Sequence, residues 1–291
     1  MNLKEIDIFN FFPQRIVEVL KKYITSSNYS FLEEIRIRIN RPIVIKYNMN
    51  FEILDYVIKT DDIQKIMQYI TENSVYSYQN QICEGFITLK GGHRVGISGN
   101  VAMENGKVKN INYIFSLNFR IAKQIIGASK KILNKVYNDG IIYNTLIVSP
   151  PGGGKTTILR DLIRVLSSYK TIGVVDERGE IAAMYKDNLQ NDLGLNVDVL
   201  NNIKKSIGIK MLIRSMSPDL ICADEIGTKE DIEAIKYAVT SGVNGVFTAH
   251  GETINKINQN PILKDLIEDK LIDQIIMLDK NDRQKIIVEK I

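Results

Sequence analysis

The sequence predicts an α/β protein in two parts, a smaller α+β domain over residues 1–126 followed by a domain with a mostly parallel sheet over residues 127–291. Three observations lead to this fold class. From about residue 130 onward, strand and helix patterns alternate, which is typical of a parallel sheet covered by helices on both faces. One apolar strand runs into a glycine-rich turn that opens a helix. Before residues 127–129, in contrast, helices mix with strictly alternating strands, so the boundary is placed there.

Local signals define the elements of the first domain. Pro13 suits the first turn of a helix whose apolar positions follow the 3.6-residue period. Thr60, followed by two aspartates, opens a second helix. Strict alternation predicts a first strand, and the turn Lys90-Gly91-Gly92 predicts a hairpin. The strands expected in this domain are 34–39, 86–89, 95–101 and 113–121.

The second domain reads as alternating strands and helices, with an irregular stretch after its second strand. Apolar runs of four or five residues give the strands, and longer stretches with helical periodicity give the helices. The expected helices are 129–137, 155–166, 203–214 and 229–240, and the expected strands are 145–148, 171–175, 220–223, 246–248, 274–278 and 285–288.

Length and composition exclude several classes of protein. The chain has 291 residues, 44% hydrophobic and 25% charged, so it is no disordered tail, collagen-like repeat or small disulfide scaffold. Its net charge is +4, and residues 1–126 carry the whole excess, with 16 basic and 12 acidic side chains against 22 of each in the rest. That excess points to a partner or a membrane surface at the first domain. It is too small to indicate direct nucleic-acid binding.

The few cysteines and histidines argue against a metal or disulfide framework. Cys83 and Cys222 stand far apart in apolar surroundings, and His93 and His250 are separated by most of the chain. The N-terminal stretch lacks the order of a signal peptide, and no uncharged stretch reaches the ~18 apolar residues of a membrane helix. We therefore expect a cytosolic protein with two buried thiols and no transmembrane segment, able to sit on a membrane partner.

The glycine-rich turn predicts a phosphate-binding loop that takes ATP and Mg²⁺. Gly152, Gly153 and Gly154 allow the backbone to curl so that its N–H groups surround phosphate oxygens at the start of a helix. In this pattern Lys155 reaches the β- and γ-phosphates, and the Thr156 hydroxyl is a ligand of Mg²⁺.

Four neighbours complete the predicted loop. Thr157 is placed for the α-phosphate, whereas Pro150 and Pro151 stiffen the entry without donating hydrogen bonds. Ser149 stands where the pattern G-x-x-x-x-G-K-[ST] has glycine, and we interpret it as a tolerated variant.

A second acidic motif supports hydrolysis rather than binding alone. Asp224 and Glu225 follow a short apolar strand whose C-terminal end is expected beside the phosphate loop. Asp224 would hold the Mg²⁺ shell, and Glu225 would orient or deprotonate the attacking water. The run Asp224–Gly227 also fits a GTPase switch, but the nearest guanine-reading sequence, Asn255–Asn258, lacks the required carboxylate. No acceptor site or lid indicates a small-molecule kinase.

Further charged residues are candidates for the γ-phosphate site. Glu177, Arg178 and Glu180 follow one strand, and His250 ends another, where it could sense the γ-phosphate. An arginine in cis or from a neighbouring subunit accelerates phosphoryl transfer. Besides Arg178 and Arg214, the candidates are Arg94 and Arg120, each embedded in an apolar strand. The helix with Lys204, Lys205, Lys210 and Arg214 is interpreted as having a solvated basic face.

These motifs together resemble the stage III sporulation protein AA family over nearly the whole chain. The matching segments are Glu34–Pro42, Gly85–Ile97, Asn118–Ala122, Pro150–Asp161, Val174–Ile181 and Ser217–Gly227. The family belongs to the secretion ATPases, which are similar to the hexameric motors of type II and type IV secretion and pilus retraction. The resemblance implies a RecA-like P-loop ATPase domain at the C-terminus. It also implies a homo-hexamer at the cytosolic face of a membrane, docked on integral membrane proteins of a channel between mother cell and forespore.

The resemblance also assigns residues and shows two departures. It implies that residues 176–180 form the acidic "Asp box", that 245–250 form the "His box", and that Arg94 and Arg120 face the nucleotide. The His box of secretion motors usually carries a first histidine after a glycine, whereas in this chain Val243 follows Gly242. Their Walker B motif usually reads Gly-Glu rather than Asp-Glu. Two functions stay open: a ring-forming ATPase, and a nucleotide-binding switch or scaffold with little turnover that gates assembly of a membrane complex.

Overall fold

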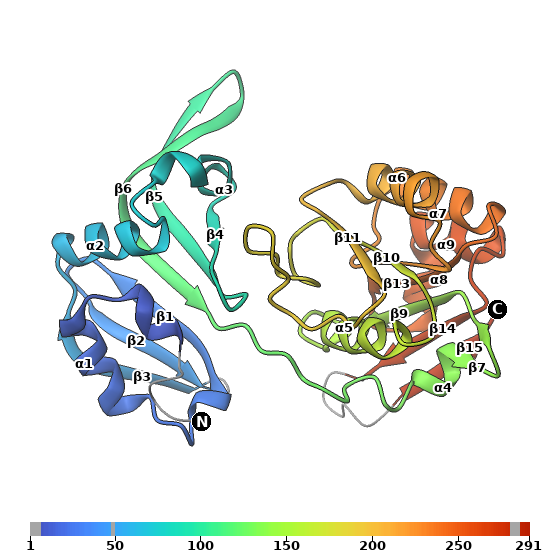
Figure 1. Cartoon of the computed structure of the whole chain (residues 1–291), viewed down its shortest axis with the longest axis horizontal. Coiled ribbons are helices and arrows are strands. Elements are labelled where there is room, and N and C mark those ends of the chain that lie inside the picture. The colour runs from blue at the N-terminus through green and yellow to red at the C-terminus, as the bar shows by residue number, and fades with distance from the viewer. Residues whose placement is uncertain (1–6, 48–49, 280–285) are drawn as a thin grey trace. The chain divides into compact units, whose positions relative to one another are not determined.

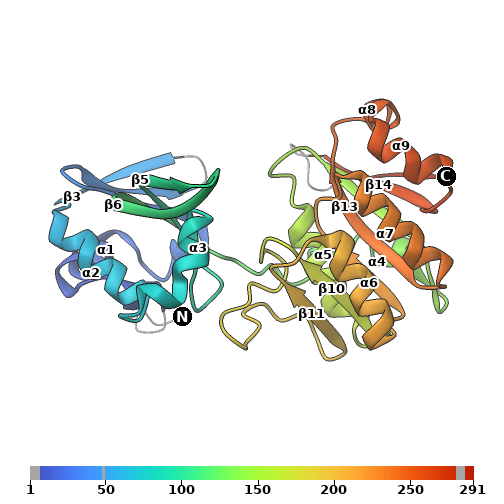
Figure 2. The ribbon, with the colours of Figure 1, turned by 90° about the horizontal axis from the view of Figure 1, so that it is seen from above.

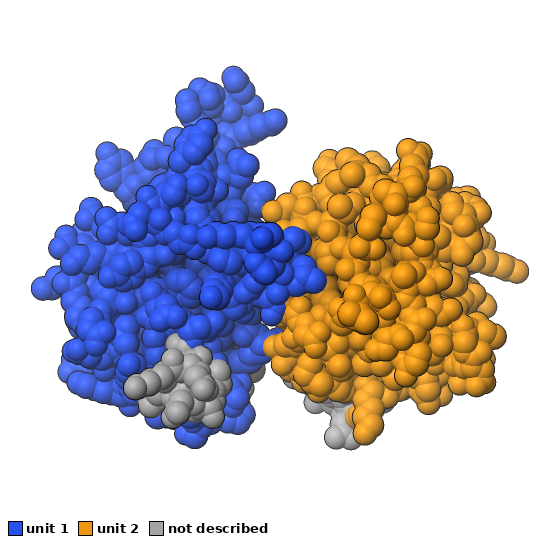
Figure 3. Space-filling view, in the orientation of Figure 1, with its two compact units in different colours: residues 1–123, 183–190 blue, residues 124–182, 191–291 orange. Residues whose placement is uncertain are grey.

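The computed structural model describes residues 7–47, 50–279 and 286–291, which form two compact units (Figure 3). Unit 1 comprises residues 1–123 together with 183–190, and unit 2 comprises 124–182 and 191–291. The chain therefore passes from one unit to the other three times. The expected domain limits, 1–126 and 127–291, remain a prediction.

Unit 1 is a six-stranded antiparallel sheet with helices on one face (Figures 1 and 2). The strand order is β3-β2-β1-β6-β5-β4. Alternation explains the one-sided core, because Ile35 and Ile37 are fully buried while Arg36 and Arg38 between and after them are half-buried. The elements are η2 Asp7–Phe11, α1 Gln14–Tyr23, η3 Tyr29–Phe31, β1 Leu32–Arg38, β2 Pro42–Tyr47, β3 Asn50–Val57, α2 Thr60–Ile70, η4 Val75–Tyr78, α3 Gln79–Cys83, β4 Phe86–Thr88, β5 Arg94–Glu104 and β6 Lys107–Arg120.

The segment 183–190 joins unit 1 through specific contacts. Tyr185 lies 3.3 Å from the Tyr78 hydroxyl and donates a hydrogen bond to Glu72, and the same carboxylate pairs with Lys186 at 2.7 Å. Gln190 accepts a 2.7 Å hydrogen bond from the Gly91 amide. A piece of chain that follows the second strand of the P-loop region is thus built into the N-terminal fold.

Unit 2 contains a seven-stranded sheet that is parallel apart from β15, with the order β11-β10-β12-β13-β9-β14-β15. In Figure 1, α6 and α7 lie above the strands of this sheet. The elements are α4 Leu133–Val136, β7 Tyr137–Asn138, β8 Ile141–Ile142, β9 Thr145–Ser149, α5 Lys155–Leu166, β10 Ile172–Asp176, β11 Val197–Asn201, α6 Lys205–Met216, β12 Leu220–Ala223, α7 Lys229–Thr240, β13 Asn244–His250, α8 Ile254–Gln259, α9 Pro261–Glu268, β14 Gln274–Leu278 and β15 Ile286–Lys290.

The predicted fold class is confirmed, with a few local differences. The helix expected at 129–137 is observed only as α4, because residues 129–132 form turns and Tyr137 already belongs to β7. The stretch expected to be irregular contains the edge strand β11. Residue 285, the expected start of the last strand, lies outside the described residues. Among the helices of the described residues, none has the length and apolar character needed to cross a membrane.

Candidate functional site

The phosphate loop connects β9 to α5, and each of its glycines has a separate structural reason. Gly152 and Gly154 adopt φ values of +77° and +88°, which side chains with a Cβ disfavour. Open space surrounds the position that a Cβ would take at either residue. At Gly153 a Cβ would lie 2.3 Å from the Ser149 hydroxyl, so only glycine fits. The loop therefore has the backbone shape of a phosphate cradle at the N-terminus of α5.

Ser149 fits without strain although the pattern has glycine there. It is the last residue of β9, is fully buried and is paired with His250 of β13. Its hydroxyl donates a 2.9 Å hydrogen bond to the carbonyl of Pro150, which also accepts from the Gly153 amide at 3.1 Å. The serine thus fastens the entry of the loop.

Lys155 is buried beneath the loop and already has polar partners. Its ammonium group donates to the Ser149 carbonyl at 3.3 Å and to Nδ1 of His250 at 3.1 Å. Burial lowers the pKa of Lys155, while the negative charges of Asp224 and Glu225 oppose this shift. Because an ammonium group only donates, Nδ1 of His250 accepts, and the ring hydrogen lies on Nε2.

Two predicted magnesium-site residues lie together. The hydroxyl of Thr156, in the first turn of α5, donates to the Asp224 carboxylate, which follows β12. Hydroxyl and carboxylate oxygens suit Mg²⁺, which keeps several waters and takes substrate phosphates as further ligands. Among the described residues no group of three or more His, Cys, Asp or Glu could hold a metal by itself. The pair therefore fits a Mg²⁺ ion that arrives with a nucleotide. Thr157 stands in the same turn.

Glu225 lies between His250 and Arg178. One carboxylate oxygen accepts a 2.9 Å hydrogen bond from Nε2 of His250, and the other is paired with Arg178. Burial alone would raise the pKa of Glu225, but the hydrogen bond from His250 and the positive charges of Arg178 and Lys155 lower it overall. The structure thus joins Lys155, His250, Glu225 and Arg178 in one chain of contacts.

Asp176 is the last residue of β10, and Glu177 and Glu180 follow it in the next loop. Asp176 is buried and accepts hydrogen bonds from the amides of Glu180, Ile181 and Ala182 at 2.8, 3.0 and 2.8 Å. Burial raises its pKa despite these bonds. Asp176 therefore shapes the loop that follows β10. The catalytic roles of Glu177 and Glu180 remain predictions.

The basic face of α6 was expected to be solvated, but Lys205 on this helix is buried. This lysine is only 9% exposed and forms an ion pair with Glu177. The desolvated cation has therefore found a carboxylate partner, as burial of a charge requires. Arg214 lies 5.8 Å from the centre of the Tyr237 ring, so its guanidinium is also in contact with protein.

Two residues near the loop were not predicted from the sequence. Arg160, one turn after Thr156, donates to the carbonyls of Glu180 at 2.6 Å and Ile181 at 3.1 Å. Thr248 of β13 is fully buried and bonds to both Asp224 and the Glu225 amide. The sequence offers one signal for each of them. Arg160 is a charged residue inside the P-loop helix, and Thr248 is a lone hydroxyl in the apolar run Val246–Ala249.

Arg94 and Arg120 belong to unit 1, where the sheet register places them side by side on β5 and β6. The Arg94 guanidinium lies 4.3 Å from the centre of the Phe86 ring. Cys222 is buried and Cys83 partly so, both as free thiols. His93 is also buried: it accepts from the Ala122 amide at 3.0 Å and lies 3.1 Å from Asp7. The nucleotide roles of the two arginines remain predictions.

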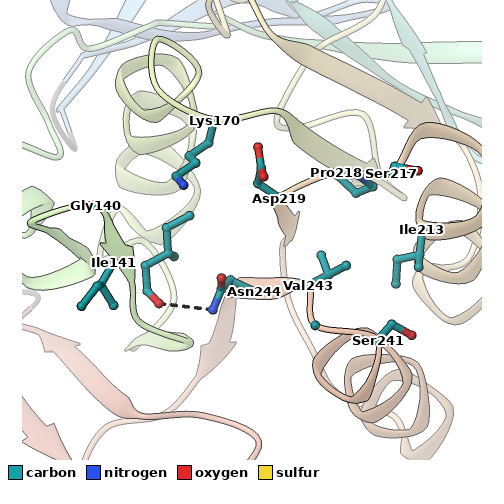
Figure 4. A pocket seen from close by; sticks show the side chains of 12 residues that line it. Gly140, Ile141, Lys170, Ile213, Ser217, Pro218, Asp219, Ser241, Val243 and Asn244 are labelled. Carbon is teal, nitrogen blue, oxygen red and sulfur yellow. Dashed lines mark hydrogen bonds between the residues drawn. The ribbon is translucent and has the colours of Figure 1, made fainter.

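A hollow of about 520 Å³ lies at the other edge of the unit 2 sheet (Figure 4). It is lined by Lys170, Asp219 and Asn244, which precede or begin β10, β12 and β13, whereas the phosphate loop follows the end of β9. Asn244 donates across its rim to the Ile142 carbonyl at 3.2 Å. None of the predicted site residues lines this hollow.

Two solved structures have the same fold as this chain. The pilus retraction motor PilT with bound ADP matches with a TM-score of 0.59 at 15% identity, covering 87% of this chain and 76% of that one. The ATPase DotB of Legionella pneumophila matches with a TM-score of 0.56 at 13% identity, covering 92% and 76%. The fold is therefore that of the secretion ATPases.

The family itself is established by sequence. The family model described as "Sporulation stage III, protein AA" matches residues 2–289. Stage III sporulation protein AA of Bacillus subtilis (strain 168) is 37% identical over 280 residues, which are 94% of this chain and 91% of that protein. This chain belongs to the stage III sporulation protein AA family.

Proposed function

We propose that this protein is a Mg²⁺-dependent ATPase that acts as a hexameric motor of the secretion type. Hydrolysis would energise the assembly of, or transport through, a membrane channel between mother cell and forespore during sporulation. The protein would sit in the cytoplasm of the mother cell, at the membrane, bound to integral membrane proteins of the channel. The membership in a sporulation family and the fold shared with a pilus retraction motor support this proposal.

The observation that carries the proposal is the meeting of two motifs at one edge of the sheet. The phosphate loop brings Lys155 and Thr156, and the end of β12 brings Asp224 and Glu225, within hydrogen-bonded contact of one another or of His250. Asp224 can serve nucleotide binding through Mg²⁺, but a site that only bound nucleotide would need no second carboxylate, Glu225, here. An acid beside a γ-phosphate site is what water activation requires.

Each group then has a defined task. The loop amides and Lys155 hold the phosphates, and Mg²⁺ held by Thr156 and Asp224 would neutralise charge on the phosphate oxygens. Glu225 accepts the proton of the attacking water. His250, now bound to Lys155 and Glu225, is placed to exchange these partners for the γ-phosphate. Arg178, and Arg94 or Arg120 from this or a neighbouring subunit, would stabilise the transferred group.

A second candidate is a nucleotide-binding switch or scaffold with little turnover, which gates assembly of a membrane complex. One observation favours it: in this structure Glu225 is paired with Arg178 and His250, and Lys155 with His250, so the reactive groups satisfy one another. Turnover requires these pairs to open, and a partner could supply that change.

The variant Glu225→Gln separates the two candidates. For a motor, ATP binding persists while steady-state hydrolysis falls roughly 100-fold or more, because the proton acceptor is gone, and sporulation fails. Glu268→Gln removes a carboxylate from an exposed pair with Lys264 and serves as the control with unchanged turnover. Normal sporulation by Glu225→Gln cells that hydrolyse no ATP would refute the motor and leave the switch.

A further inference from the structure

Thr248 carries a buried hydroxyl group beside the two acidic residues that follow β12. It lies on a central strand, β13, and is fully buried between apolar neighbours. Its hydroxyl donates to one carboxylate oxygen of Asp224 and accepts a 2.9 Å hydrogen bond from the Glu225 amide. Both hydrogen-bonding capacities of one side chain are therefore directed at the two acidic residues that follow β12.

Glu225 has a backbone conformation that must be held in place. Its φ of +55° lies in the left-handed region, which residues with a Cβ disfavour. The amide of Glu225 binds the Thr248 hydroxyl, and the amide of the next residue, Ile226, binds the Thr248 carbonyl at 2.8 Å. Thr248 thus fixes the backbone at Glu225 and at the residue after it. This holds Glu225 in its strained conformation, in which its side chain contacts His250.

Asp224 is held from two directions. One carboxylate oxygen accepts from Thr248 of β13, and the other accepts from Thr156 of the P-loop helix. When an ion replaces the Thr156 contact, the Thr248 contact still fixes the orientation of the carboxylate. Partners of this kind, one step outside the ligands, set ligand geometry and basicity.

We propose that Thr248 is the positioning residue of this site, which orients Asp224 toward Mg²⁺ and Glu225 toward the attacking water. This inference rests on the proposed function for its catalytic part. The positioning itself is a property of the chain without nucleotide. A valine would match the size and strand preference of threonine, but would leave the partly buried Glu225 amide without its partner.

The test compares Thr248→Val with Thr248→Ser, which keeps the hydroxyl. Thr145→Val is the matched control, because Thr145 is also fully buried in the same sheet and donates to the Tyr143 carbonyl at 2.7 Å at the opposite edge. Five quantities are measured: hydrogen exchange of the Glu225 amide without ligand, the Mg²⁺ concentration at half-maximal binding of a fluorescent ADP analogue, kcat and KM for ATP, and the melting temperature.

For Thr248→Val we expect faster exchange at Glu225, a roughly 10–100-fold higher Mg²⁺ requirement and a kcat lowered by a similar factor. Binding of the ADP analogue in EDTA and the KM for ATP should change little, since the phosphate loop is untouched. Thr248→Ser should recover most of kcat and of the Mg²⁺ response. Thr145→Val should lower only the melting temperature.

Two outcomes would overturn the inference. In the first, Thr248→Val lowers the melting temperature as Thr145→Val does and leaves exchange, Mg²⁺ response and kcat as in the wild type. In the second, Thr248→Ser is as impaired as Thr248→Val. A wild type that hydrolyses no ATP refutes the ATPase proposal alone, because amide exchange and Mg²⁺-dependent ADP binding still decide the role of Thr248. If Thr248→Val does not fold, fast exchange of the Glu225 amide in the wild type contradicts the inference.

Discussion

Glu225 is held by residues that each act on its charge. His250 donates a hydrogen bond to it, Arg178 pairs with it, and Lys155 acts from beyond the imidazole ring. These groups keep the carboxylate ionised at a pH where an isolated glutamate would be protonated. A base with a lowered pKa is weaker, but it is ready at any physiological pH.

The pH dependence of catalysis reports this arrangement. The pKa of Glu225 is lowered from 4.5, so the acid limb of kcat/KM should lie below pH 4.5 in the wild type. His250→Asn keeps an acceptor near Lys155 but loses the Nε2 donor, so the pKa of Glu225 rises and the limb moves to higher pH. His250→Gln restores a donor near Nε2 and should move it less. Equal shifts in both variants, or none in His250→Asn, would contradict this account.

Among the elements, α5 joins the phosphate loop to the start of unit 2. Its Asp161 is 1% exposed and accepts from the Gly127 amide, from the Ser129 amide and hydroxyl, and from Arg164. Burial alone would raise the pKa of this carboxylate, but the hydrogen bonds from Ser129, Arg164 and Gly127 lower it overall. The helix is thereby fixed to the segment that enters the unit.

Asp161→Asn should lower the free energy of unfolding by about 1–3 kcal/mol at neutral pH, because charged hydrogen bonds are lost in a buried place. Since the folded pKa lies below the ordinary 3.8, this stabilisation is complete above that pH and is lost as pH falls through the folded pKa. The difference between wild type and variant should therefore shrink in acid. Asp269→Asn, in an exposed pair with Lys236, should cost at most about 1 kcal/mol. Chemical denaturation at several pH values measures both, and a difference independent of pH would contradict the assignment.

Sequence patterns predicted the elements where the local signal agreed with the packing. The predicted helices 155–166 and 229–240 have the observed bounds of α5 and α7, since glycine or a threonine cap marks the start of each. The helix expected at 129–137 was wrong at both ends, because residues 129–132 form turns and Tyr137 begins the short strand β7. The strands β2, β3 and β11 were not predicted. Strand β11 has no buried face that alternation could reveal.

In the candidate site, too, some residues were predictable from local sequence patterns and others were not. Lys155, Thr156, Asp224 and Glu225 belong to short motifs, and the structure brings them together. The contacts of Thr248 with Asp224 and Glu225 join segments that only the fold brings together, so no local pattern reveals them. Periodicity shows which side of a strand is buried, but not which buried hydroxyl has a carboxylate beside it.

At the scale of the whole molecule, the chain crosses between its two units three times. The segment 183–190 is fixed in unit 1 by Glu72 and Gly91, while its flanking residues Ala182 and Asn191, hydrogen-bonded to each other at 3.2 Å, belong to unit 2. The loop that Asp176 and Arg160 shape therefore continues directly into the N-terminal fold. In the proposed motor, this segment would connect the nucleotide site to unit 1.

The central claim, an ATPase that works as a ring, is tested most directly by steady-state ATP hydrolysis of the wild type and Lys155→Ala, with light scattering in the presence and absence of ATP and Mg²⁺. The account predicts turnover that falls roughly 100-fold or more without the lysine, because the charge that holds the phosphates is lost, and assembly promoted by ATP in the wild type alone. Turnover that survives Lys155→Ala, or a wild type that binds ATP yet neither hydrolyses it nor assembles, would contradict it.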